Sequence, residues 1–270
     1  MTGFESATFG MLILMVFLVL PVIYWIRRAR VGSNLYVRKI AGIAAIDEAI
    51  GRAAELGRPV SFCSGLTSIS PVLYACLGVL HYIAQKAAVY RSKLFLPQTV
   101  PEVMAITEDV VREAYREEGR SAAFDPGSLL FLSEEQFAFA AGYIGLIQRE
   151  KIGAAFLFGQ YGAEALILAE SGQQVGAMQI AATVSPEQVA FFICTCDYTL
   201  IGEELFAASA YLTREPVQLG SLYGQDRAKL TFLLLILAGV LVATYNSVAA
   251  VYFPGSEITN IDMLISKRFW

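Results

Sequence analysis

Two long uncharged runs lie near the ends of the chain, and shorter apolar and polar segments alternate between them. Residues 6–26 are 21 consecutive positions without a charged side chain, and residues 230–253 are 24 such positions. About 20 apolar residues are enough for a helix to cross the hydrocarbon core of a bilayer. We therefore predict a transmembrane helix over 6–26, another over 230–253, and a short extracytoplasmic tail over 254–270.

Basic residues gather on the inner side of both runs and predict the orientation. Residues 27–39 form a basic juxtamembrane segment, with Arg27, Arg28, Arg30, Arg38 and Lys39. Arg227 and Lys229 precede the second run, and the outer flanks carry only Lys267 and Arg268. Because positive residues stay on the cytoplasmic side, we expect residues 27–229 in the cytoplasm and both termini outside.

The second run carries small residues at every fourth position. Gly239, Ala243 and Ser247 share one helix face, and Asn246 can add a hydrogen bond between helices. Small residues at this spacing let two helices approach closely in lipid. The stripe is suited equally to the first span of the same chain and to a neighbouring copy.

The segment 40–229 alternates helical and extended patterns. We expect helices over 40–57, from Ser70, from Pro101, from a capping box at 133–136 to Arg149, over 154–169 and over 198–213. Strands are expected over 60–64, 94–96, 129–132, 177–183 and 191–194, with a loop over 121–128. Strands separated by helices favour a parallel sheet covered on both faces. The predicted fold class is α/β, Rossmann-like, flanked by the two transmembrane helices.

Composition and charge narrow the partners of this domain. Only 16% of the residues are charged, against about 25% in soluble proteins, which agrees with an association with the lipid bilayer. Residues 40–229 hold 13 Lys and Arg against 21 Asp and Glu, a net charge of −8. Nucleic-acid binding needs a basic surface, so we exclude nucleic acid as a partner.

One loop has the composition of an anion-binding turn. Ser64, Gly65, Thr67 and Ser68 follow the first predicted strand and precede a helix, where backbone N–H groups can bind phosphate. Neither a GxGxxG pattern nor a Walker lysine is present. An ordinary strand-to-helix turn with a serine cap explains the same residues, so both interpretations stay open.

Several acidic residues lie in apolar surroundings. Glu164 is flanked by aliphatic and aromatic residues, and a buried carboxylate must be paired, hydrogen-bonded or protonated. Asp197, Glu203 and Glu204 follow the last predicted strand in a comparable setting. These carboxylates are candidates either for structural ion pairs or for a ligand site, with Arg149, Lys151 and Arg214 as candidate partners. The similar segments 162–166 and 202–206 leave open a duplicated half-domain.

The remaining reactive side chains predict no catalysis. His81 is the single histidine, and without a nucleophile motif we expect it in the core or at an interface. Cys194 and Cys196 lack the spacing of zinc ligands, and with Cys63 and Cys76 they are expected as reduced thiols. We predict no catalytic residue, no metal and no cofactor.

Three stretches, 38–48, 157–164 and 196–204, resemble a family of prokaryotic two-span membrane proteins known as a domain of unknown function. The resemblance covers most of the chain and implies a prokaryotic inner membrane as the location. It implies no activity and no functional residues.

We expect a membrane-anchored, self-associating scaffold or assembly module, and closed symmetry would make it a ring. The alternative is a membrane-bound enzyme or sensor that binds a small anionic ligand or nucleotide at the strand ends. Aromatic residues in excess of one core favour self-association. They are Phe137, Phe139, Phe156, Phe158, Tyr161, Phe191, Phe192 and Phe206.

Overall fold

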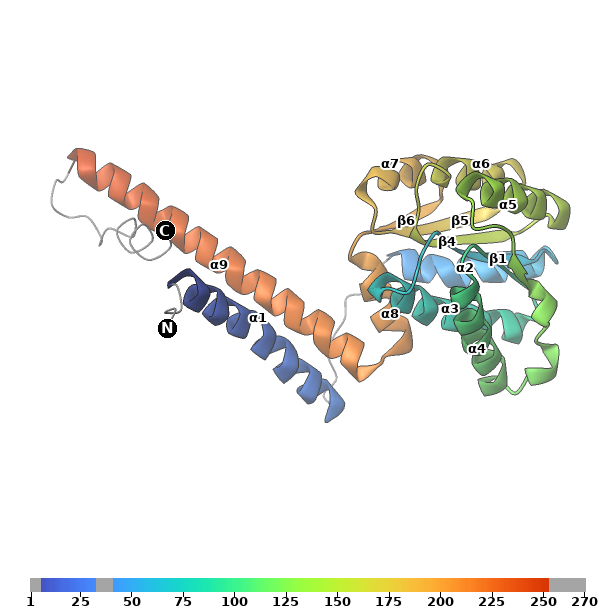
Figure 1. The fold of residues 1–270 in the computed structure, drawn as a ribbon, viewed down its shortest axis with the longest axis horizontal. Helices are drawn as coiled ribbons and strands as arrows, with labels where there is room; N and C mark the ends of the chain where they lie inside the picture. The colour runs from blue at the N-terminus through green and yellow to red at the C-terminus, as the bar shows by residue number, and fades with distance from the viewer. Residues whose placement is uncertain (1–5, 33–40, 253–270) are drawn as a thin grey trace, which may run out of the picture. The chain divides into compact units, whose positions relative to one another are not determined.

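The structure, a computed structural model, describes residues 6–32 and 41–252. It divides into two compact units, one of residues 37–214 and one of residues 1–36 with 215–270 (Figure 1). The predicted tail over 254–270, the basic residues Arg38 and Lys39, and the start of the helix expected at Ile40 lie outside the described residues.

The first unit is a parallel α/β domain, as the alternating pattern predicts. Its strands are β1 (Val60–Gly65), β2 (Leu94–Gln98), β3 (Leu129–Phe131), β4 (Ala154–Gln160), β5 (Met178–Thr183) and β6 (Tyr198–Ile201). Its helices are α2 (Ala41–Glu55), α3 (Pro71–Tyr90), α4 (Pro101–Glu117), α5 (Gln136–Glu150), α6 (Ala165–Gln174), α7 (Pro186–Thr195) and α8 (Glu204–Thr213). All strand pairs are parallel, in the order β3-β2-β1-β4-β5-β6.

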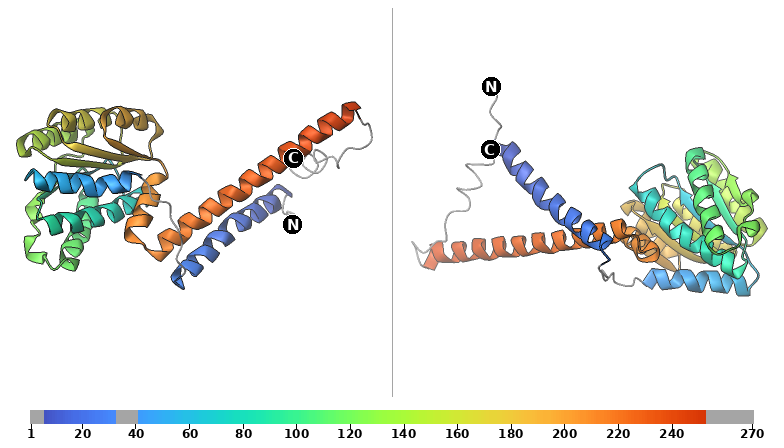
Figure 2. Two further views of the ribbon diagram at one scale, coloured as in Figure 1. Left: turned by 180° about the vertical axis from the view of Figure 1, so that it is seen from behind. Right: turned by 90° about the horizontal axis from the view of Figure 1, so that it is seen from below.

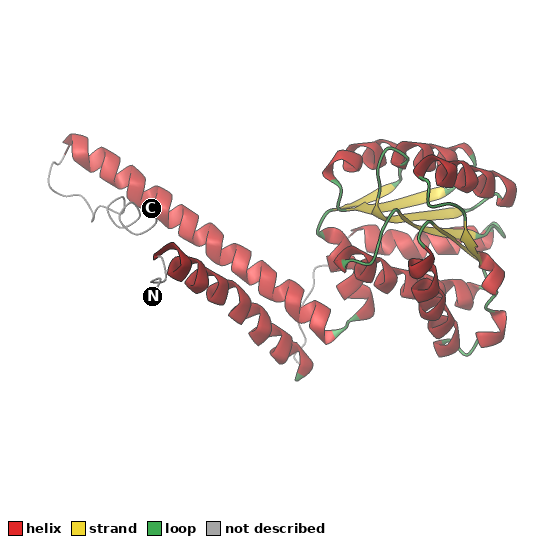
Figure 3. Cartoon of the chain, viewed as in Figure 1, coloured by secondary structure: helices red, strands yellow, loops and turns green. Residues whose placement is uncertain are grey.

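The sheet lies between two layers of helices (Figures 2 and 3). Helices α2, α3, α4 and α8 cover one face, where Phe62, Phe156 and Phe158 are buried. Helices α5, α6 and α7 cover the other, where Phe139 and Phe192 are buried. Because both faces are covered, the sheet buries more aromatic side chains than we expected. Of the eight aromatic residues assigned to an interface, only Phe137, Phe191 and Phe206 are exposed.

The second unit pairs α1 (Ser6–Arg30) with α9 (Pro216–Tyr252). A Cβ on Gly224 would lie 2.8 Å from the Cα of Val22, and Gly220 lies as close to Ile26, so the two helices run antiparallel. Each step along α9 is therefore one step back along α1. This register places Asp226, Arg227 and Lys229 beside roughly residues 17–20 of α1.

Two helices of the described residues are long and apolar enough to cross a membrane, and α1 is not one of them. One is α3, which is 61% buried and is a core helix of the α/β domain. The other is residues 216–249 of α9, which are only 6% buried. Helix α9 begins at Pro216, well before the boundary expected at Leu230.

The helix predicted over 154–169 is wrong in its first half, which is the strand β4. Residues 154–158 are uniformly apolar because β4 is buried on both faces between β1 and β5, so no period of two is visible. Gly159, with φ of 150°, and the turn at 161–164 separate β4 from the short helix α6.

The strand predicted over 191–194 is also wrong. These residues belong to α7, whose first residue is Pro186, a position that proline favours. The last strand is β6, inside the segment expected to be helical. The capping box at 133–136 does not form either, because the Ser133 hydroxyl accepts a hydrogen bond from Glu135 N–H and α5 begins at Gln136.

Candidate functional site

The strand order reverses between β1 and β4, and ligands of open α/β sheets bind outside the carboxyl ends of the strands at such a point. Two loops meet there, the β1–α3 loop over 66–70 and the β4–α6 loop over 161–164. The predicted residues Ser64, Gly65, Thr67 and Ser68 belong to the first of these loops or to the strand end before it. Glu164 belongs to the second.

The hydroxyl of Thr67 ties the carboxyl ends of β1 and β4 together. It donates a hydrogen bond to the carbonyl of Ser64 and accepts one from Gln160 N–H at 2.8 Å. Leu66 N–H donates to the Gln160 carbonyl at 2.9 Å. A Cβ on Gly65, which has φ of 61°, would lie 2.5 Å from that same carbonyl, so the close approach needs glycine.

The backbone N–H groups at the start of the β1–α3 loop are used within the protein. Gly65 N–H points to the Cys63 sulfur, and the N–H groups of Leu66 and Thr67 donate to backbone carbonyls. A phosphate cradle needs such groups to be free for the ligand. Of the four predicted loop residues only Ser68 is exposed. Phosphate binding at this loop stays a prediction.

Sequence reasoning missed Gln98, the last residue of β2. Its side-chain oxygen accepts a hydrogen bond from the Ser64 hydroxyl at 3.0 Å, and Gln98 is only 1% exposed. Its Nε2 has no hydrogen-bond partner in the described part of the chain. A polar residue at the carboxyl end of an otherwise apolar strand is the signal that could have identified it.

Glu164 is fully buried, as its apolar neighbours led us to expect. Its carboxylate accepts hydrogen bonds from Gly162 N–H, at 3.0 and 3.1 Å to the two oxygens, and from the Gln136 side-chain amide. It stands immediately before α6 rather than inside a longer helix. The partners are neutral groups, and within the described residues Glu164 forms no hydrogen bond or ion pair with any of the three basic residues expected as its partners.

The other predicted acidic residues do not form one cluster. Asp197 precedes β6, at the amino end of the sheet, and its carboxylate accepts from Gln179 N–H at 2.7 Å. Glu203 and Glu204 follow β6 at the carboxyl end, where Glu204 accepts from Ile201 N–H at 3.0 Å. Strand β6 separates the two groups, because the last strand lies after Asp197 rather than before it.

The buried thiols are kept neutral by their surroundings. Burial raises the pKa of the Cys63 thiol to about 12, and the Tyr161 hydroxyl donates to the Cys63 carbonyl at 2.7 Å. Burial also raises the pKa of Cys76, whose thiol donates to the Phe158 carbonyl at 3.3 Å. Because a thiolate is the nucleophilic form, neither residue is suited to covalent catalysis.

The remaining candidates lie apart from these loops. His81, on α3, is half-buried and places Nε2 3.2 Å from the Glu117 carboxylate on α4. Cys194 is exposed on α7, and Cys196 directly follows that helix.

The small-residue stripe of α9 is open over the described residues. No atom lies within 4 Å of a Cβ built on Gly239, and Ala243 and Ser247 are exposed. The Ser247 hydroxyl donates to the Ala243 carbonyl within the helix. The positions that receive α1 are instead Gly220 and Gly224.

The fold and this sheet edge define an α/β protein of the doubly wound class, with the strand reversal between β1 and β4. The chain belongs to a family described as a domain of unknown function, DUF6754, whose model matches residues 1–253. The resemblance to such a domain is thereby confirmed, whereas the two spans and the prokaryotic origin stay predictions. No curated protein and no solved structure matches the chain.

Proposed function

We propose that this protein is a membrane-anchored scaffold module whose copies associate with one another. The observation that carries the proposal is the exposed apolar surface of α9. Ten large apolar side chains of α9 are exposed, and they point in all directions around the helix. They are Leu230, Leu233, Leu234, Leu235, Ile236, Leu237, Val240, Leu241, Tyr245 and Val248. A surface of this kind is stable in lipid and would aggregate in water.

Helix α1 is proposed to cross the bilayer beside α9. A collar of aromatic and basic residues where the two helices meet supports this arrangement. The rings of Trp25 and Tyr223 pack edge to face with centroids 4.5 Å apart, and Arg28 and Arg227 lie over them. Aromatic and basic side chains of this kind favour the headgroup region on the cytoplasmic side.

The offset between the two apolar runs sets a condition on this proposal. With residues 6–26 in the bilayer, the backbone of Arg227 and Lys229 would lie within the hydrocarbon core, beside the second half of the α1 span. Long basic side chains can extend from there to the headgroup region. The Arg227 guanidinium donates to the Tyr223 hydroxyl at 2.7 Å, toward the start of α9 and the collar. Asp226 and Lys229 are three residues apart, where opposite charges partly compensate.

Self-association is supported by surfaces of both units. The stripe of Gly239, Ala243 and Ser247 is not used by α1 in the described residues. In the α/β domain, β6 ends the sheet, and apolar residues of β6 and of the neighbouring helix α7 are exposed. They are Phe191, Ile193, Tyr198 and Ile201. An edge strand with apolar neighbours is a natural place for another copy to pair.

Copy number and topology test the proposal directly. We expect more than one chain per particle when the full chain in lipid nanodiscs is weighed by mass photometry. Gly239→Leu with Ala243→Leu should lower that number, whereas Ala238→Leu with Val242→Leu, on another face of the helix, should not. A single chain per particle would refute self-association.

A reporter fused after Trp270 tests the orientation. An enzyme active only outside the cytoplasm should be active at this position, because both termini are proposed to be extracytoplasmic. Activity of a reporter that works only in the cytoplasm would refute this topology. The same reporter placed at Ser121, in an exposed part of the α/β domain, provides the opposite control.

A further inference from the structure

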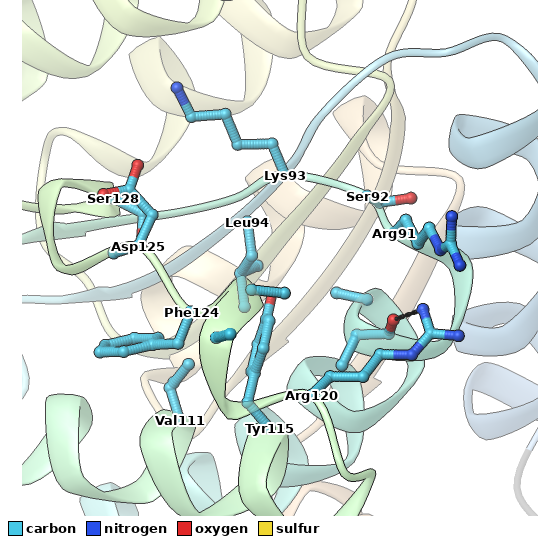
Figure 4. Close-up of a pocket in the computed structure, with 14 residues that line it drawn as sticks. Arg91, Ser92, Lys93, Leu94, Val111, Tyr115, Arg120, Phe124, Asp125 and Ser128 are labelled. Atoms are coloured by element: carbon cyan, nitrogen blue, oxygen red, sulfur yellow. Dashed lines mark hydrogen bonds between the residues drawn. The ribbon is translucent and has the colours of Figure 1, made fainter.

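A cavity of about 710 Å³ opens at the amino ends of β2 and β3. The loops at the β1–β4 reversal lie at the other end of the strands, the carboxyl end. It lies between the end of α3, the turn before β2, the helix α4 and the segment 120–128 (Figure 4). Its volume is in the range of small-molecule sites, which is about 300–1,000 Å³. Sequence reasoning did not consider this edge, because ligands of such folds are expected at the carboxyl ends.

The inner wall of the cavity is apolar and partly aromatic. Leu94 of β2 and Val111 and Tyr115 of α4 are buried there, and Phe124 packs edge to face on Tyr115 with ring centroids 5.9 Å apart. The small side chains of Ala87 and Ala88 of α3 complete this wall. Such a wall suits a ring or another flat apolar group.

The rim of the cavity is basic, although the domain as a whole is acidic. Arg91 is exposed and forms no ion pair within the described residues. Figure 4 shows Arg91 and Arg120 beside the end of α3 and Asp125 on the other side, whereas the Lys93 amino group extends away from Tyr115 and Phe124 and lies over the Phe95 ring, 4.5 Å from its centroid. Two guanidinium groups and one carboxylate, that of Asp125, therefore lie on the α3–α4 side of the rim.

Arg120 prepares this place for an anion. Its guanidinium donates to the carbonyls of Ala88 and Val89, the last turn of α3. The carboxyl end of a helix carries a partial negative charge that would repel an anion, and the guanidinium offsets it. Arg91, with φ of 58°, directly follows that helix end, and Ser92 comes next.

We propose that this cavity binds an organic phosphate, with the phosphate at Arg91 and Ser92 and a ring against Tyr115 and Phe124. One guanidinium group can donate two parallel hydrogen bonds to two phosphate oxygens, and a serine hydroxyl adds a further donor. Asp125 flanks the far side, where a polar group of the ligand binds. This assignment does not depend on self-association or on membrane topology.

Four probes test the ligand class on the full chain in detergent by isothermal titration calorimetry. AMP carries both a ring and a phosphate, adenosine only the ring, inorganic phosphate only the anion, and glycerol 3-phosphate the phosphate of a lipid headgroup. AMP should bind most tightly of the four. Absence of AMP binding at millimolar concentration would overturn the proposal, as would equal binding of inorganic phosphate or of glycerol 3-phosphate.

Two variants test the location. Arg91→Gln should weaken AMP binding about tenfold, the effect of losing a hydrogen bond to a charged group. Lys151→Gln is the matched control, because Lys151 is also exposed, also ends a helix and also has a positive φ, of 51°, outside the cavity. Equal losses in both variants would overturn the assignment.

Ala122→Trp gives an independent check at an exposed position of the cavity lining, where substitution leaves the core intact. It should block AMP binding without lowering the melting temperature of the ligand-free protein. Unchanged AMP affinity in this variant would place the ligand elsewhere.

Discussion

Gly220 of α9 lies so close to α1 that a Cβ at this position would be 2.5 Å from the Cα of Ile26. Four residues on, Gly224 approaches Val22 in the same way. Two glycines at this spacing let two helix backbones come into contact, and that contact is a main source of attraction between helices in lipid.

Replacing Gly220 with Leu should therefore separate α1 from α9. A disulfide between Trp25→Cys and Tyr223→Cys, in a chain without its natural cysteines, reports the pairing because the two rings are in contact. We expect Gly220→Leu to reduce cross-linking strongly. Gly239→Leu is the control, because no atom lies within 4 Å of a Cβ at that residue. Equal cross-linking in both variants would contradict the observed packing.

Thr67 is predicted to stabilise the fold through its hydroxyl. Thr67→Val keeps the shape of the side chain but leaves Gln160 N–H without its acceptor and the Ser64 carbonyl without this donor. A buried polar group left unpaired costs about 1–3 kcal/mol. Thermal unfolding followed by circular dichroism should show a lower melting temperature for Thr67→Val and an unchanged one for Ser68→Ala, whose side chain is exposed.

The parallel α/β class was predictable because turn residues mark the ends of elements and the helical period of apolar residues identifies the helices between the strands. Gly57, Ser70 and Pro101 mark element boundaries close to those observed. The wrongly predicted elements are those whose apolar residues follow neither the helical period of about 3.6 residues nor the strand period of two. β4 is buried on both faces, and α7 is a short helix rich in residues that favour strands.

The candidate site was predictable only in part, because its partners come from distant segments. Thr67 meets Gln160, and Glu164 meets Gln136, through pairings that depend on the order of the strands. The cavity at the amino ends of the strands depends on where α3 ends and on the path of residues 120–128. No spacing along the sequence indicates such a cavity. The spacing of Gly220 and Gly224 could have predicted the contact with α1, because it is the same four-residue spacing as in the stripe at 239–247.

Glu164 should contribute to stability through the hydrogen bonds that it accepts from neutral donors. Glu164→Leu leaves Gly162 N–H and the Gln136 amide without their acceptor, at a cost of about 1–3 kcal/mol for each unpaired group. Glu164→Gln keeps one acceptor oxygen and should cost less. Urea unfolding should give the order of stability wild type, Glu164→Gln, Glu164→Leu. Equal stability of all three would mean that the carboxylate is solvated.

The four thiols should differ widely in reactivity, since Cys194 is exposed and Cys63 and Cys76 are buried. Burial raises the pKa of Cys63 and of Cys196 to about 12, so both stay largely protonated at pH 8.5. A thiol-specific reagent should label Cys194 rapidly in the native protein and all four cysteines after unfolding. Cys194→Ser should abolish the fast phase, and rapid labelling that persisted in this variant would contradict the burial of the others.

The same raised pKa values predict a loss of stability in alkali. In the unfolded chain these thiols ionise near pH 9, whereas in the folded protein Cys63 and Cys196 hold their protons to about pH 12. The folded state therefore binds more protons over this interval, and the free energy of unfolding should fall as the pH rises from 9 to 12. Cys63→Ala with Cys196→Ala removes both titrating groups, so its stability should decline less steeply over that interval. An equally steep decline in this variant would assign the alkaline sensitivity to other groups.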